Sequence, residues 1–138
     1  MTEEHENPLL VLPRQECLRL LRAGGVGCIG LPSSGAPLLR PVNFTLQGDA
    51  LVIRTGEGRI LDAARRLDLV SLEIQDVDRL EHTGWSVLVS GKLAELPSDA
   101  LTAALPLRAW ASGRKDRLVA LTLDEVSGLR IPPGRGNR

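Results

Sequence analysis

The sequence predicts an all-β fold, an antiparallel barrel that carries a few short helices. Short apolar runs recur between turn residues, and several of them alternate between apolar and polar positions. These runs follow one another as hairpins instead of alternating one-for-one with helices, which favours an antiparallel barrel over a parallel sheet. The chain shows no internal repeat at the periods typical of solenoids and propellers. Its 138 residues suit a single domain.

The first expected element after an acidic N-terminal arm (residues 1–12) is an amphipathic helix. Pro13 suits the first turn of this helix, and the Gly24-Gly25 pair suits its end. A short strand is expected next, at residues 26–31. We expect the apolar face of the helix to cover one end of the barrel; it comprises Cys17, Leu18, Leu20 and Leu21.

The centre of the chain predicts two consecutive strands that lead into a helix. The strands are expected at residues 38–46 and 50–55, and the helix at 60–66. A glycine-rich loop precedes the helix, where free backbone N–H groups and the helix dipole favour an anion. This end of the hairpin is therefore a candidate phosphate site, and the cations near it are Arg40, Arg54 and Arg59.

The second half of the chain predicts further strands. Residues 69–75 alternate cleanly, and 76–83 are expected to form a polar loop. The longest strand is expected at 84–95, with a bulge or bend at Gly91. Its predicted inward face contains Trp85, Val87, Val89 and Leu93.

The last elements expected are a short helix at residues 97–105 and a strand at 118–123. Residues 126–131 either extend that strand or pair separately. The total is six or seven strands and three short helices. We expect one domain over residues 13–131, followed by a basic, disordered tail at 132–138.

Composition excludes several function classes. Lys plus Arg and Asp plus Glu number 17 each, so the domain lacks the basic surface of a nucleic-acid binder. No apolar segment is long enough to span a membrane. No export signal is evident, and Cys17 and Cys28 do not form a disulfide framework. We therefore expect a cytoplasmic protein with reduced cysteines and no membrane partner.

Few side chains suggest protein-based catalysis. His5 and His82 have no His or Cys partner at metal-ligand spacing, so no metal site is expected. Asp76 and Asp78 lie close together, but such a pair more often caps a loop than performs acid–base chemistry. No catalytic residue can be assigned. If the protein is an enzyme, a cofactor carries its chemistry.

The order of several motifs resembles one known family. A capped helix and a Gly-Gly strand come first. They are followed by Arg40-Pro41-Val42-Asn43-Phe44, Ile53-Arg54-Thr55, Gly58-Arg59, Thr83-Gly84-Trp85-Ser86-Val87-Leu88-Val89 and Gly91-Lys92-Leu93. Over about residues 13–131, this pattern resembles the pyridoxamine 5′-phosphate oxidase-like, FMN-binding split-barrel proteins, in their small single-domain actinobacterial form.

The resemblance implies a six-stranded Greek-key split barrel that forms a homodimer, with FMN in grooves at the dimer interface. The strand containing Arg40, Pro41, Val42 and Asn43 would lie beside the isoalloxazine ring. The phosphate would be bound near Arg54, Thr55, Gly58 and Arg59. Trp85 would lie near the flavin or the dimer interface, or else pack as a core ring.

Two departures from the family pattern bear on function. Gly58 stands where the family frequently has Ser, which removes one hydroxyl from the phosphate site. The Trp-Arg-Leu-x-Pro-like run of true pyridoxamine phosphate oxidases is also missing, so we do not expect that reaction. The resemblance implies an FMN-dependent oxidoreductase acting on a small molecule. The alternatives are a reductase that uses a deazaflavin cofactor and a non-catalytic dimeric module.

Overall fold

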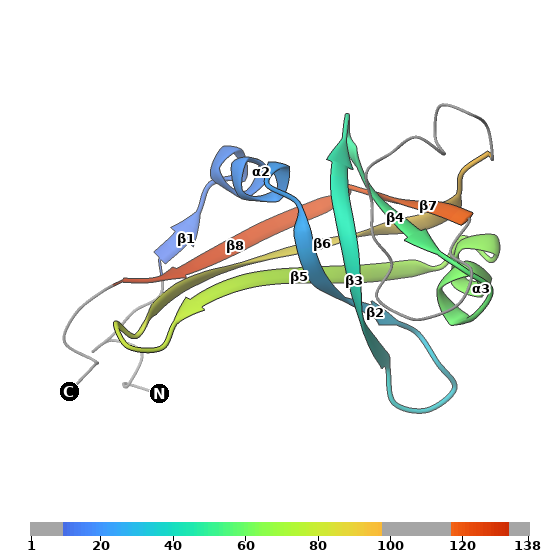
Figure 1. Ribbon diagram of the computed structural model, residues 1–138, viewed down its shortest axis with the longest axis horizontal. Helices are drawn as coiled ribbons and strands as arrows, with labels where there is room; N and C mark the ends of the chain where they lie inside the picture. Colours follow the sequence, from blue (N-terminus) through green and yellow to red (C-terminus); the bar gives the residue numbers. More distant parts are fainter. Residues whose placement is uncertain (1–9, 98–116, 133–138) are drawn as a thin grey trace.

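The computed structural model describes residues 10–97 and 117–132. This part of the chain contains eight strands and two helices (Figure 1). In chain order they are β1 (Leu10–Leu12), α2 (Arg14–Arg22), β2 (Gly25–Leu31), β3 (Leu38–Gln47), β4 (Ala50–Thr55), α3 (Arg59–Arg65), β5 (Leu69–Asp78), β6 (Thr83–Glu95), β7 (Arg117–Thr122) and β8 (Glu125–Ile131).

The eight strands form one sheet in the order β1-β8-β6-β5-β2-β3-β4-β7, and every pairing is antiparallel. A further pairing of β6 with β7 closes six of these strands into a ring. Strands β8 and β1 lie outside the ring, beyond β6. This arrangement confirms the predicted all-β fold with a six-stranded antiparallel barrel.

Strand β6 pairs with three other strands. It pairs with β5 along most of its length, with β8 over residues 84–90 and with β7 over 93–95. The change of partner occurs around Gly91, where the sequence predicted a bulge or bend. A Cβ atom at Gly91 would lie 2.0 Å from the carbonyl oxygen of Thr122, so only glycine fits there.

Alternating residues of the strands build the core. On β5 and β6 the fully or nearly fully buried side chains include Leu72, Ile74, Val87 and Val89, as the period-2 pattern predicted. Trp85 is half-buried and packs against this core. The predicted inward face of β6 is therefore confirmed.

Helix α2 packs against β8, β3 and β6 through its predicted apolar face. Cys17 and Leu21 are fully buried. Burial raises the pKa of the Cys17 thiol, so this thiol is protonated at neutral pH. Pro13 immediately precedes the helix, and its carbonyl oxygen accepts hydrogen bonds from the N–H groups of Glu16 and Cys17.

Strands β5 and β6 extend well past the barrel, and the expected polar loop at 76–83 was wrong. Pairing continues from Gln75 opposite Ser86 to Asp78 opposite Thr83, so only residues 79–82 form the turn. In this outer part the end of β5 and the turn lack a buried side, since residues 75–82 are all exposed. These residues therefore need no apolar alternation, and they resemble a loop in sequence.

Three other expectations differ from the structure or lie outside it. Leu10–Leu12, expected within the N-terminal arm, form a strand paired with β8. Glu125–Ile131 pair separately with β6, which raises the strand number to eight in the described ranges. The expected helix at 97–105 lies almost wholly outside the described residues, as does nearly all of the tail at 132–138.

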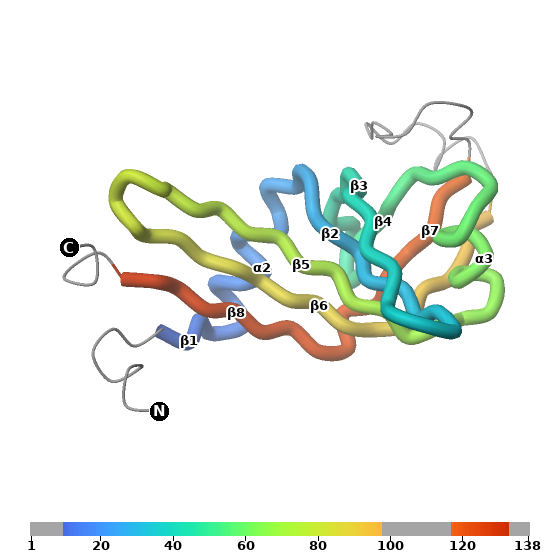
Figure 2. The backbone as a smooth tube through the Cα atoms, turned by 90° about the horizontal axis from the view of Figure 1, so that it is seen from below, coloured from blue at the N-terminus to red at the C-terminus, as the bar shows by residue number. Residues whose placement is uncertain are grey.

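The molecule is elongated because β5, β6 and β8 project from the barrel as an arm (Figures 1 and 2). Helix α2 covers one side of this arm, and α3 lies at the opposite end of the molecule. Strand β1 pairs with β8 on the arm, so both ends of the described chain lie at the arm side of the molecule. Among the described residues, no helix has the length and apolar character needed to cross a membrane.

Candidate functional site

The connection from β4 to α3 brings four of the predicted site residues together. Arg54 and Thr55 end β4, Gly58 precedes the helix, and Arg59 is its first residue. The side chain of Arg54 is half-buried and that of Arg59 is exposed. The Thr55 hydroxyl donates to the carbonyl oxygen of Gly56 over 3.3 Å. Two guanidinium groups and a hydroxyl therefore occur within six residues of chain.

Gly58 gives this connection its shape. Its φ of 145° lies in the region that glycine adopts freely, and nothing lies within 4 Å of the point where a Cβ atom would be. No side chain caps the N-terminus of α3. The helix has only seven residues, so we assign the attraction for an anion to the guanidinium groups and not to the helix dipole.

Nearby carboxylates are already paired. Arg65 of α3 lies 3.0 Å from Glu95 and 3.7 Å from Glu57, and its hydrogen bond with Glu95 raises the pKa of the Arg65 guanidinium. Arg117 of β7 lies 4.0 Å from the same Glu95. Within residues 10–97 and 117–132, the carboxylates of Glu57 and Glu95 are thus offset by cations other than Arg59.

The four predicted site residues of the neighbouring strand β3 are consecutive along that strand. Phe44 pairs with Ile53, so Asn43 and Arg54 are the next residues along their two strands. Val42 is 6% exposed and belongs to the core, whereas Arg40 and Pro41 are exposed. Arg40 lies three residues further, about 10 Å along the strand, and its Nη1 donates to the carbonyl oxygen of Leu39. Asn43 is thus nearest to the arginine pair, and Arg40 is more distant.

Trp85 lies on the arm, apart from the other predicted residues. Trp85 is paired with Asp76 of β5 and Arg130 of β8. The residue of β6 that lies in the same row of paired residues as Arg40, counted across β5 and β2, is Val89, four residues further along the strand. In one chain the indole and the arginine pair therefore belong to different regions. Trp85 lines a hollow of about 560 Å³.

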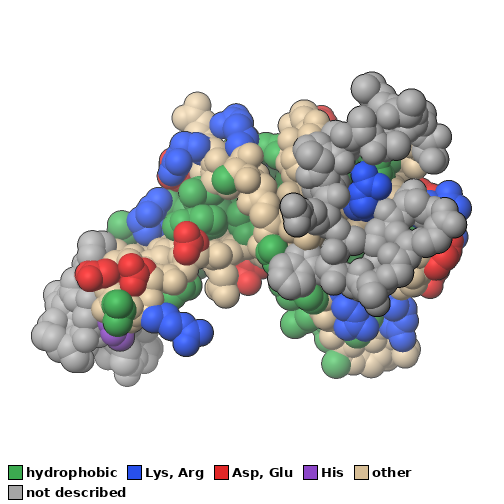
Figure 3. Space-filling view, in the orientation of Figure 1, with side chains coloured by type: hydrophobic (Ala, Val, Ile, Leu, Met, Phe, Trp, Pro, Cys, Tyr) green, Lys and Arg blue, Asp and Glu red, His purple; other side chains and the backbone are tan. Residues whose placement is uncertain are grey.

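Three acidic side chains line the hollow beside Trp85, and acidic side chains gather at the free end of the arm (Figure 3). Those that line the hollow are Asp76, Asp78 and Glu81. The carboxylate of Asp78 accepts hydrogen bonds from the N–H groups of Leu80 and Glu81 at 3.0 and 3.1 Å. Asp78 thus caps the turn, as the sequence favoured. Arg130 also lines the hollow, and its guanidinium lies 3.4 Å from Glu16 of α2.

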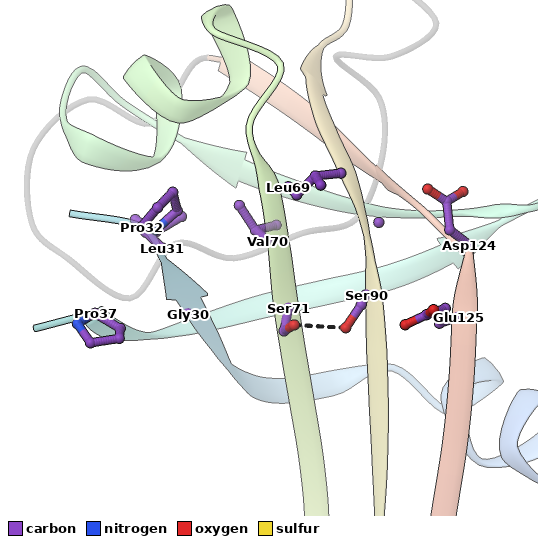
Figure 4. Close-up of a pocket in the computed structure, with 11 residues that line it drawn as sticks. Gly30, Leu31, Pro32, Pro37, Leu69, Val70, Ser71, Ser90, Asp124 and Glu125 are labelled. Atoms are coloured by element: carbon purple, nitrogen blue, oxygen red, sulfur yellow. Dashed lines mark hydrogen bonds between the residues drawn. The ribbon is translucent and has the colours of Figure 1, made fainter. Parts of the chain in front are cut away.

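A second hollow, of about 600 Å³, was missed by sequence reasoning (Figure 4). It lies between the end of the β2–β3 hairpin and the neighbouring strands β5 and β6. The hydroxyls of Ser71 and Ser90 are hydrogen-bonded across its floor at 2.7 Å. None of the predicted site residues lines it. Its signal in the sequence is weak, because it depends on the register of β5 with β6. The other lining residues are Gly30, Leu31, Pro32, Pro37, Leu69, Val70, Gly91, Asp124 and Glu125.

Comparison with known proteins gives the fold and the site a context. Residues 13–130 match the family model described as pyridoxamine 5′-phosphate oxidase. That match spans nearly the whole described chain. The protein belongs to the pyridoxamine 5′-phosphate oxidase family.

Individual relatives agree with this family assignment. An uncharacterized protein of Mycobacterium tuberculosis is 30% identical over 87% of this chain and 84% of its own length. The structure of an FAD-binding protein of Mycobacterium smegmatis has a TM-score of 0.68 at 25% identity, covering 90% of this chain and 99% of that one. A candidate pyridoxamine 5′-phosphate oxidase of Corynebacterium glutamicum has a TM-score of 0.74 at 26% identity, covering 94% and 98%.

Proposed function

We propose that this family member is an FMN-binding flavoprotein and an oxidoreductase, but not a pyridoxamine phosphate oxidase. The observation that carries the proposal is the β4–α3 connection. Arg54 and Arg59 supply two planar cations suited to phosphate oxygens, and Thr55 supplies a hydroxyl. The open space around Gly58 leaves room for the phosphate itself.

The donor set fits the phosphate end of a flavin nucleotide. Arg54, Thr55 and Arg59 would hold the phosphate through their side chains. Gly58 would contribute only its backbone. Strand β3 would lie along the isoalloxazine ring through Arg40, Pro41, Val42 and Asn43. When bound, a flavin supplies a ring that takes up and releases electron pairs. The protein's own part is to bind the ring, orient it and restrict access of water to it.

The assembly and location proposed for this flavoprotein follow from the family resemblance. The active form would be a homodimer with the flavin at the interface, acting on a small-molecule substrate in the cytoplasm. Because Trp85 is distant from the arginine pair within one chain, this indole would reach the same flavin from a second chain. The proposal assigns no residue to proton transfer.

Flavin titration tests the proposal and separates its alternatives. We expect FMN to bind and its fluorescence to change on binding. A preference for FAD would follow the name of the relative from M. smegmatis. A preference for a deazaflavin cofactor would favour the reductase reading. A folded protein that binds none of the three would favour the non-catalytic module.

The double variant Arg54→Ala/Arg59→Ala tests the site itself. Hydrogen bonds to charged groups contribute about 1.5–3 kcal/mol each, so losing two should weaken FMN binding at least about 100-fold. Riboflavin, which lacks the phosphate, should bind both proteins equally. The matched control is Arg14→Ala/Arg22→Ala, which removes two exposed arginines from α2. Unchanged FMN affinity in the Arg54/Arg59 double variant would refute the assigned phosphate site.

A further inference from the structure

The first residue of β7 is a further arginine beside the proposed phosphate site. Arg117 is the direct partner of Thr55 in the antiparallel pairing of β4 with β7. Paired residues of this kind project to the same face of a sheet, with their Cβ atoms about 4.5–5.5 Å apart. The two strands run side by side at the end of the molecule that carries α3 (Figure 1). A guanidinium group therefore originates next to the Thr55 hydroxyl, although the two residues are distant in sequence.

Thr55 and Arg117 lie at the end of the barrel interior. Ile53 and Val119, two residues away on the same strands, are paired with each other and fully buried. Because side chains alternate along a strand, Thr55 and Arg117 belong to this inward face, one step nearer the end of the barrel. Both are half-buried, so they lie where the core meets solvent. An anion bound there would contact both side chains.

The faces of β4 explain why Arg117 matters to this site. Arg54 and Thr55 are successive residues, so their side chains leave the strand on opposite faces. The arginine that shares the face of Thr55 is Arg117 on the neighbouring strand. A phosphate at the end of β4 would thus be contacted by Arg54 from one face and by Thr55 with Arg117 from the other.

Glu95 of β6 lies next to Arg117 and has a closer partner. It is paired with Val119, two residues from Arg117 on β7. Its Oε1 accepts a hydrogen bond from Nε of Arg65 at 3.0 Å, whereas its Oε2 lies 4.0 Å from Nη1 of Arg117. The second distance is beyond hydrogen-bonding range, so this contact is a charge interaction only. Arg65 therefore satisfies Glu95, and Arg117 is held loosely.

The guanidinium of Arg117 retains its capacity for hydrogen bonds. Among residues 10–97 and 117–132 its side chain donates to no acceptor, and it is 40% exposed. A guanidinium carries five N–H donors in a planar arrangement that matches the oxygens of a phosphate. Arg117 is thus a cation that can turn to a new anion without leaving Glu95 unpaired.

We infer that Arg117 is a third cation for the phosphate of the proposed flavin, and that Glu95 holds it in reserve until the phosphate binds. This inference deepens the proposed function and rests on it for the identity of the anion. Thr55 would donate from β4 and Arg117 from β7, so the phosphate would join the two strands. Arg59 would approach from the first position of α3.

The balance of charge favours a third cation. A phosphate monoester carries roughly 1.5 to 2 negative charges at neutral pH. Arg54 and Arg59 would only neutralise it, whereas a third guanidinium gives a net attraction. When Arg117 turns to the phosphate, Arg65 remains hydrogen-bonded to Glu95. The exchange therefore leaves each carboxylate and each phosphate oxygen with a cation nearby.

Parallel titrations with FMN and riboflavin test the inference. Arg117→Ala should raise the dissociation constant of FMN at least about 10-fold and leave that of riboflavin, which lacks the phosphate, unchanged. Arg117→Lys keeps the charge without the planar fork, so its FMN affinity should be intermediate. This variant also serves if Arg117→Ala fails to fold. The matched control is Arg66→Ala, since Arg66 is exposed at the end of α3 and is paired with Asp68 at 2.9 Å; it should bind FMN as the wild type does.

Glu95→Gln tests the reserve role of the carboxylate. Removing its charge removes the competitor for Arg117, so FMN should bind at least about threefold more tightly, with riboflavin unaffected. A purely structural role for this cluster leads to the opposite result, because Glu95 also anchors Arg65 of α3. Unchanged or weaker FMN binding in Glu95→Gln would overturn the reserve role.

Inorganic pyrophosphate separates this inference from the proposed function. Calorimetry without flavin should show that the wild type binds pyrophosphate and that Arg117→Ala binds it at least about fivefold more weakly. That result in a protein that binds no FMN would refute only the proposed function. Full FMN and pyrophosphate affinity in Arg117→Ala, with weaker binding in the Arg54/Arg59 double variant, would overturn only the role of Arg117. A wild type that binds neither FMN nor pyrophosphate would overturn both.

Discussion

The backbone conformation of Gly58 explains a residue that differs from the family pattern. The resemblance suggests serine at this position, but the φ of 145° is a conformation that L-residues with a side chain rarely adopt. A serine hydroxyl could be gained only at the cost of backbone strain. The proposed phosphate site would therefore depend more heavily on Arg54 and Arg59 than a serine-containing site would.

Substituting Gly58 tests this interpretation. Gly58→Ala should lower the free energy of unfolding by about 1–2 kcal/mol, because the new Cβ atom is free of clashes and only the backbone is strained. Urea denaturation measures the change. Gly35→Ala is the control, since Gly35 also has open space but no positive φ. Equal stability of the two variants would show that the strain at Gly58 is negligible.

For individual site residues, the sequence predicted well which side chains lie close together in space when those residues are close along the chain. Arg54, Thr55, Gly58 and Arg59 lie within six residues, so any strand–turn–helix arrangement brings them together. Trp85 is different, because its neighbours are set by the register of β6 with β5 and β8. A one-residue shift in register changes the face of every side chain, and the sequence does not specify that register by local chemistry.

The docking of α2 on β8 depends on one close approach. A Cβ atom at Gly128 would lie 2.7 Å from Sγ of Cys17 and 3.0 Å from Cδ1 of Leu12. The glycine therefore allows the helix to lie directly on the strand. The ion pair of Arg130 with Glu16 secures the same contact at the surface, although exposed pairs of this kind contribute little.

A double-mutant cycle measures this contact. Gly128→Ala should lower the free energy of unfolding by about 2–3 kcal/mol through overpacking. In the Cys17→Ala background the smaller side chain leaves room, so the cost of Gly128→Ala should fall by about 1 kcal/mol or more. Guanidinium denaturation of the four proteins gives the coupling energy. Strictly additive effects would mean that the clash is relieved elsewhere.

The element boundaries also show where pattern reasoning applies. Strands with one buried side were predicted to within a residue or two, because burial imposes alternation on them. The outer end of β5 is exposed on both faces, so its pairing with β6 is maintained by backbone hydrogen bonds and leaves no apolar pattern. β1, only three residues long, is likewise too short for a periodic signal.

The barrel as a whole depends on the change of partner by β6. Residues before Gly91 pair with β8, and residues after Lys92 pair with β7. The hydroxyl of Thr122 accepts a hydrogen bond from the N–H of Lys92 at 2.9 Å, which joins the two halves. The sequence predicted that the strands form a closed barrel. It did not predict which strands pair with β6, because residues 84–95 and 117–131 are distant in sequence.

Gly91→Ala tests how strongly closure depends on this position. The atom nearest to the new Cβ is the backbone carbonyl oxygen of Thr122 at 2.0 Å, followed by Oγ1 of Thr122 at 2.6 Å and the carbonyl carbon at 2.8 Å. Rotation of the Thr122 side chain cannot relieve the clash with the backbone. We expect a loss of at least about 3 kcal/mol in the free energy of unfolding. The control is Gly30→Ala, whose Cβ atom would have ordinary contacts from 3.4 Å outward. Similar stabilities for the two variants would contradict a tight closure at Gly91.

The three partners of β6 also bear on how the chain folds as it is made. A ribosome would release β2 to β6 before β7 and β8, so β6 would wait with the edge that pairs with β7 and β8 unpaired. Pairing across such sequence distances is slow, because a long loop must close before any contact forms. We expect amides in the middle of β6 to exchange with deuterium last, since they open only when the whole barrel unfolds.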